Sequence, residues 1–122
     1  MQPNVVGDHS FIRWPIRLPF GAVLQKVYVI HFINTSAAET FRITRRRTTW
    51  DPFDVEIPTE DELVEVVTGT TVGAHRTELN VAGTTVDRYD EICLQWEPSA
   101  LLGNTVNAIT VEFQDNGPSP IG

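Results

Sequence analysis

Cysteine is nearly absent from this sequence, and long apolar runs are absent altogether. The single Cys93 excludes a disulfide bond within the chain. No stretch approaches the ~18 apolar residues of a membrane-spanning helix, and residues 1–10 lack the basic start and apolar centre of a secretory signal. With neither internal repeats nor low-complexity segments, the 122 residues are expected to form one domain with its own hydrophobic core and no membrane contact.

The sequence also lacks any motif that identifies a reaction. Its three histidines, His9, His31 and His75, are widely separated, and the lone cysteine adds no short metal-ligand spacing. His31 stands in a long apolar stretch, where a hydrogen-bonded core or interface histidine is the expected role. The prediction is a protein with no catalytic residue, no metal and no cofactor.

Two chemical alternatives stay open. Asp8, His9 and Ser10 are the residue types of a catalytic triad, but adjacent residues of an extended chain point in alternating directions. A triad would therefore need His9 or His75 to meet a hydroxyl from a distant segment. Calcium binding by the acids at 60–62 is the second alternative, although these acids lack the regular spacing and the glycine of a calcium loop.

Alternating hydrophobic residues predict short β-strands separated by turns. Residues 11–18 alternate around Pro15, which has no N–H to donate, so an edge strand or a bulged strand is expected. Residues 22–34 are apolar on both faces, which favours a central strand, and "TSAAE" after them is interpreted as a hairpin link into the next strand. Further strands are expected at 62–69, 75–83, 88–98 and 104–113.

The predicted fold is all-β: a two-sheet antiparallel β-sandwich of seven to eight strands, jelly-roll-like, with an immunoglobulin-like strand order as the alternative. An N-terminal arm is expected at 1–10, a single sandwich domain at 11–114 and a flexible C-terminal tail at 115–122. Proline, glycine and polar residues dominate both terminal segments, which suits arms that become ordered against a neighbour. The inward positions predicted near the end of the chain are Ile92, Leu94, Trp96, Ile109, Val111 and Phe113.

Residues 51–62 interrupt the alternating pattern. The segment "DPFDVEIPTEDE" carries two prolines and a dense set of acids. We expect there a long exposed loop, with at most a short strand at 55–57.

Arg42, Arg45, Arg46 and Arg47 supply four of the nine cations in a chain whose net charge is −7. In a strand, Arg45 and Arg47 face one side while Arg42 and Arg46 face the other, so the basic stripe is split. The negative net charge and the acids that follow argue against phosphate, and nucleic acid is the least favoured partner. Carboxylates of a second protein surface are favoured over local carboxylates, because alternation makes local pairing of every arginine difficult.

Two of the three tryptophans fall on inward positions. Trp14 and Trp96 are expected in the core, whereas Trp50 is expected at the surface. An exposed tryptophan beside arginines has the composition of a protein–protein hot spot. A flat exposed ring also suits sugar stacking, so a carbohydrate-binding or receptor-binding module is the alternative function.

Two stretches resemble a protein family. "WPIRLPFGAVLQKVYVIHFINTSAAETFRITRRR" (residues 14–47) is similar to the opening segment, long strand and arginine-tipped strand of small β-sandwich virion proteins of tailed bacteriophages. "YDEICLQWEPSALLGNTVNAITVEF" (residues 89–113) is similar to their closing strands, whereas residues 51–65 match no motif of the family. The resemblance implies a non-enzymatic capsid decoration, head-fibre or tail-associated protein. It implies an oligomer, often a trimer, that binds a capsid or other virion protein and resides in the virion after assembly in the host cytoplasm.

A protein interface is therefore predicted where the arginine strand ends and the acidic segment begins. The residues assigned to it are Arg45, Arg46, Arg47, Trp50, Asp51, Asp54, Glu60, Asp61 and Glu62.

Overall fold

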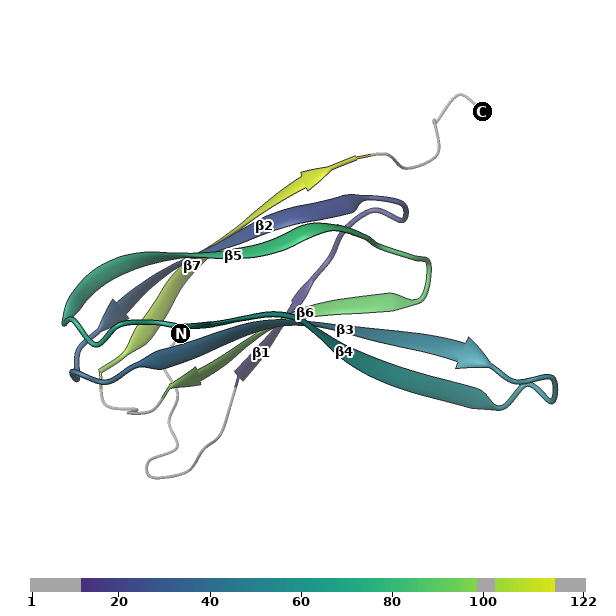
Figure 1. The fold of residues 1–122 in the computed structure, drawn as a ribbon, viewed down its shortest axis with the longest axis horizontal. Helices are drawn as coiled ribbons and strands as arrows, with labels where there is room; N and C mark the ends of the chain where they lie inside the picture. Colours follow the sequence, from purple (N-terminus) through teal and green to yellow (C-terminus); the bar gives the residue numbers. More distant parts are fainter. Residues whose placement is uncertain (1–11, 99–102, 116–122) are drawn as a thin grey trace.

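Two antiparallel sheets face each other in the computed structural model, which describes residues 12–98 and 103–115 (Figure 1). The predicted two-sheet antiparallel β-sandwich of seven to eight strands is confirmed, with seven strands in the described residues. The predicted N-terminal arm and all of the predicted tail except residue 115 lie outside the described residues. The strands are β1 (Ile12–Ile16), β2 (Val23–Ile33), β3 (Glu39–Trp50), β4 (Glu56–Val67), β5 (Gly73–Thr85), β6 (Asp90–Pro98) and β7 (Thr105–Gln114).

The strand order is β1-β6-β3-β4 in one sheet and β5-β2-β7 in the other. β3 and β4 form a hairpin, and every other pair of consecutive strands lies in different sheets. The two expectations for the first strands are confirmed: β1, with Pro15, is an edge strand, and β2 is central. The predicted hairpin link at 35–39 is wrong, because it crosses from one sheet to the other. Alternation specifies which face of a strand is buried, but it does not specify the neighbouring strand.

The core lies between the closed parts of the two sheets. Ile92, Leu94 and Trp96 on β6 point inward as predicted and are fully or almost fully buried. Trp14 lies beside Trp96, with ring centroids 6.2 Å apart, so Trp96 is inside the core as predicted and Trp14, half-buried, packs against it. The other fully buried hydrophobic residues are Ala22, Leu24, Val27, Val29, Ile33, Phe41, Ile43 and Leu79.

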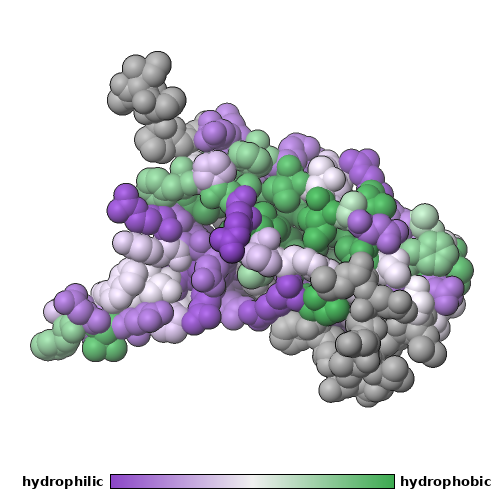
Figure 2. Space-filling view, turned by 180° about the vertical axis from the view of Figure 1, so that it is seen from behind, coloured by the Kyte–Doolittle hydropathy of each residue, from purple (hydrophilic) through white to green (hydrophobic). Residues whose placement is uncertain are grey.

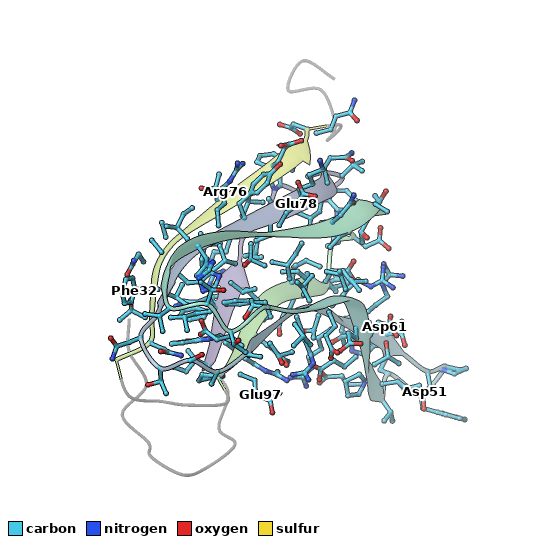
Figure 3. The ribbon with its side chains drawn as sticks, turned by 60° about the vertical axis from the view of Figure 1, so that its left-hand side comes forward. Phe32, Asp51, Asp61, Arg76, Glu78 and Glu97 are labelled. Atoms are coloured by element: carbon cyan, nitrogen blue, oxygen red, sulfur yellow. The ribbon has the colours of Figure 1, made fainter. Side chains whose placement is uncertain are left out.

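The sandwich is closed along one side and open along the other. β4 lies against β5 where the sheets approach, whereas among the described residues no comparable contact joins β1 and β7. Figure 3 shows the two sheets diverging toward one end. The inward positions predicted on β7 have the right face but incomplete cover: Ile109 and Val111 are half-buried, and Phe113 is 41% exposed.

The predicted loop at 51–62 is wrong. Only residues 51–55 form a turn, and β4 begins at Glu56 and runs for twelve residues. Its first residues are poor strand formers, Pro58 included, so local propensity predicts a loop. Pairing with β3 overrides that preference, because β4 is an edge strand in which a missing N–H is tolerated.

A buried polar cluster joins the two sheets. His31 on β2 shares hydrogen bonds with Glu39 on β3 (Nδ1 to Oε1, 3.0 Å) and with Thr77 on β5 (Nε2 to Oγ1, 2.7 Å). The indole N–H of Trp96 donates to the second carboxylate oxygen of Glu39. His31 is thus the hydrogen-bonded core histidine that the sequence predicts, and both His31 and Glu39 are fully buried.

Replacing Glu39 is expected to be costly for stability. Glu39→Ala leaves the Trp96 indole N–H and a His31 ring nitrogen buried without their partner, so the free energy of unfolding should fall by about 2–5 kcal/mol. Thr77→Val removes one hydrogen bond and should cost about 1 kcal/mol. Urea unfolding of both variants checks this, and equal losses would contradict a central role for Glu39.

Candidate functional site: a projecting hairpin arm

β3 and β4 continue beyond the rest of their sheet. The two strands pair with each other from Thr40 and Val67 to Trp50 and Glu56, whereas β6 accompanies β3 only as far as Arg47. The remaining two-stranded ribbon, residues 48–59, is called the arm below. It projects past the sandwich at the open end of the molecule (Figure 1).

The arm begins where the inner face of β3 changes from apolar to charged. Ile43 is fully buried, but Arg45, two residues further on, lies opposite Asp61 of β4. Arg45 Nη2 donates to Asp61 Oδ2 over 2.9 Å. Arg47, the next residue on this face, donates through Nε and Nη2 to the two oxygens of Asp90, over 2.8 and 3.0 Å. The apolar core therefore ends at these ion pairs, whereas β3 continues beyond them.

Asp90 is held ionised at the base of the arm. Burial of the carboxyl acts to raise its pKa, but the hydrogen bonds from Arg47 and from the backbone N–H of Asp87 outweigh burial and lower the pKa below its usual value. The Arg47 pKa is raised, chiefly by the hydrogen bonds to Asp90 and further by the nearby charge of Asp87, 2.8 Å away.

The arginines on the outer face of β3 differ from each other. Arg42 donates to Glu65 over 2.7 Å and to Glu97 over 2.6 Å, and these two hydrogen bonds raise its pKa. Arg46 lies opposite Glu60 and Glu91 in the strand register and is exposed. Among the described contacts, no hydrogen bond or ion pair of Arg46 is found.

The sequence-based argument that local carboxylates cannot satisfy the arginines is therefore wrong for three of the four, Arg42, Arg45 and Arg47. The hairpin folds the acidic segment onto the basic one and brings Asp61 to Arg45, whereas the partner of Arg47, Asp90, comes from β6 on the other side of β3. The Asp51-Pro52 pair is a turn signal, but it does not specify that the turn ends at residue 55, and a loop at 51–62 would have kept the two segments apart.

Asp51 builds the turn at the tip of the arm. Its Oδ1 accepts hydrogen bonds from the backbone N–H groups of Phe53 (2.8 Å) and Val55 (2.9 Å). Its backbone N–H donates to the carbonyl of Val55, and its carbonyl accepts from Asp54, which has a φ of 60°. The turn therefore holds one defined shape without contact from the sandwich. Figure 3 shows Asp51 at the far end of the arm and Asp61 near its base.

The tip of the arm exposes apolar side chains. Phe53 is 85% exposed, and Trp50, Val55 and Ile57 are between 44% and 55% exposed. Figure 2 shows hydrophobic residues at the end of the arm, separated from the rest of the molecule by hydrophilic residues. We call Trp50, Phe53, Val55 and Ile57 the apolar tip.

Trp50 also forms one wall of a shallow cleft. Its ring meets that of Tyr89 edge to face, with centroids 4.8 Å apart. The cleft has a volume of about 380 Å³ and includes Glu56, Arg88 and Glu91 among its lining residues. An aromatic pair beside carboxylates is a surface on which a sugar ring can stack.

The nine residues assigned to an interface from the sequence thus cluster along one hairpin, but most acids have partners inside the chain. Glu60 pairs with Arg13 at 3.0 Å, and Glu62 with Arg42 at 3.1 Å. Trp50 is exposed as predicted. The sequence reasoning missed Phe53, Val55, Ile57 and Tyr89. The alternating "VEI", interpreted above as at most a short strand at 55–57, marks the start of β4.

Neither a metal-binding cluster nor an activated cysteine is found among the described residues. No group of His, Cys, Asp and Glu side chains within 12–98 and 103–115 is arranged to hold a metal ion. Burial raises the pKa of the Cys93 thiol, which is the opposite of the change that activates a cysteine nucleophile. Over the same residues, no helix is long and apolar enough to span a bilayer.

Comparison with known proteins finds no matching family model, no similar curated protein and no similar solved structure.

The Asp90 pair should make stability depend on pH. Because the folded pKa of Asp90 is lower than the unfolded value of about 4, the unfolded chain binds the proton more readily. The stabilisation is complete above the unfolded pKa and is lost as the pH falls through the folded pKa. Asp90→Asn should therefore lower the free energy of unfolding by about 1–3 kcal/mol at pH 7.

Urea unfolding of wild type and Asp90→Asn from pH 7 to pH 2 measures this dependence. The difference between the two proteins should shrink toward acid. Asp54→Asn, which makes the same substitution at an exposed residue of the arm, is the control. A difference for Asp90→Asn that stays constant over the whole range would contradict the assignment.

Proposed function

We propose that this chain is a non-enzymatic structural protein that attaches to an assembled protein shell through its arm. The resemblance in the sequence makes the capsid of a tailed bacteriophage the proposed shell and the virion the proposed location. In that role the chain decorates and stabilises the capsid by protein–protein contacts, as a homo-oligomer.

The observation that carries the proposal is the apolar tip. Phe53 and its neighbours gain nothing from exposure to water, and burying one such side chain is worth about 1.5–3 kcal/mol. The sandwich covers Trp50 only in part, through Tyr89, and the arm that carries the other three side chains points away from the sandwich (Figure 1). Exposed apolar clusters rimmed by polar residues are typical of protein interaction sites.

The shape of the arm favours docking into a recess rather than onto a flat face. The Asp51 hydrogen bonds preset the turn, so little conformational entropy is lost on binding. The acids along the arm, Asp54 and Glu56 among them, favour a recess whose rim is basic. Arg46, exposed at the base, is the arginine best placed to reach a carboxylate of the partner.

Truncating the tip should remove binding without unfolding the protein. Phe53→Ala is expected to weaken attachment by at least about tenfold, as for other aromatic hot spots, with an unchanged urea midpoint. Arg46→Ala should weaken attachment less and reduce its dependence on salt. Phe20→Ala, which truncates an exposed phenylalanine outside the arm, is the matched control.

The measurement is co-migration with particles. The protein is purified from its source to test whether it travels with a particle in a density gradient, and the variants are then titrated onto particles stripped of it. Absence of any particle, or equal binding by Phe53→Ala and Phe20→Ala, would overturn the proposal.

A carbohydrate-binding or receptor-binding module is the second candidate, favoured by the cleft between Trp50 and Tyr89. A glycan array separates the two functions. Specific glycan binding that is lost in Trp50→Ala but kept in Phe53→Ala would support the cleft, because Phe53 is not one of the residues that line it.

A further inference from the structure

Among the described residues, positions 108–112 of β7 form an open strand edge on the other side of the sandwich from the arm. These five residues pair on one side only, with β2. The register of β7 against β2 is regular from Ala108 to Glu112, so this part of the edge is straight. Thr110, at its centre, is exposed. Straight open edges are templates for pairing with another strand.

The other three edges carry features that hinder such pairing. β1 is five residues long and contains Pro15. β4 contains Pro58, is dense in acids and bulges at Leu63, which has no counterpart on β3. β5 lies against β4 and bends at Ala82 and Gly83, which both have positive φ. β7 has no proline, and Glu112 is its single ionisable residue.

We propose that β7 pairs antiparallel with β7 of a second copy of this chain, about a twofold axis at Thr110. The two three-stranded sheets then form one six-stranded sheet. Residues directly opposite each other in a sheet share a face, so Ile109 of one copy meets Val111 of the other. Glu112 then faces Ala108 of the second copy, and the two glutamates stay apart.

The net charge of the chain and the uncovered residues between the two sheets both favour a second copy of this chain as the partner of β7. A chain of net charge −7 opposes its own association along most surfaces, and β7 is a segment where two copies meet with almost no like charge. The added strand also covers the open seam between the sheets, where Ile109 lines a cavity of about 280 Å³ beside Trp14. Figure 2, which views this side, shows hydrophobic residues gathered on it.

This inference does not rest on the arm or on the proposed function. It differs from the trimer that the resemblance implies, because self-pairing of one edge closes a twofold dimer. Phe53→Ala should leave the dimer unchanged, so failure of one proposal is distinguishable from failure of the other.

Sedimentation equilibrium over a concentration series tests the dimer. The wild type should reach twice the mass of one chain. Thr110→Lys places two like charges opposite each other at the axis and should raise the dimer dissociation constant at least about tenfold. Ala74→Lys adds the same charge to an exposed position on β5, at the other edge of the sheet, and should leave the dimer intact.

A cross-link tests the register independently of folding effects. In a Cys93→Ser background, Thr110→Cys places thiols within disulfide reach across the axis, and mild oxidation should link the two copies. Ala74→Cys should link at least about tenfold more slowly. A monomer at every concentration, a trimer, equal weakening by the two lysine changes, or equal cross-linking by the two cysteine changes would each overturn the proposal.

Discussion

The pairing of inward-facing arginines with acids on the neighbouring strands is the constraint on which the rest of this structure depends. Arg45 and Arg47 occupy positions on β3 that continue the face of Phe41 and Ile43, where further apolar residues would extend the core. Because Asp61 and Asp90 neutralise them, the core ends there while the hairpin continues. Without these pairs, two partly buried cations at the end of the core would lose their charge-assisted hydrogen bonds. The arm is thus a consequence of where the charges lie.

The parts of the fold that the sequence predicted are those that depend on periodicity. The inward faces of β1 and β6 follow from alternation, as does the core position of Trp96, and the apolar character of both faces of β2 indicated its central place. The strand expected at 62–69 covers the second half of β4, whereas the first half was predicted as a loop and takes its structure from pairing with β3. The strand order was not predictable either. It depends on contacts between distant strands, such as the hydrogen bond between Glu39 on β3 and His31 on β2, and no local sequence pattern encodes such contacts.

The interface residues predicted from the sequence lie along one hairpin, but most of their charges pair within the chain. The basic and acidic segments were expected to meet partners on another protein, whereas the hairpin folds them onto each other. The charges therefore shape and hold the arm, and the apolar tip is the part left for a partner. This division also separates the two surfaces of the molecule: the arm ends in Phe53, and the β7 edge lies across the sandwich with a single acid.

Hydrogen–deuterium exchange with and without the assembled particle tests most directly whether the arm is the docking element. The account predicts that residues 50–57 exchange faster than the core strands in the isolated protein, because only hydrogen bonds within the arm protect their amides, and that they become more protected on the particle. The strands around Leu94 and Val29 should be equally protected in both states, because the core does not change. Unchanged exchange of residues 50–57 together with new protection on another surface of the bound protein would contradict the account.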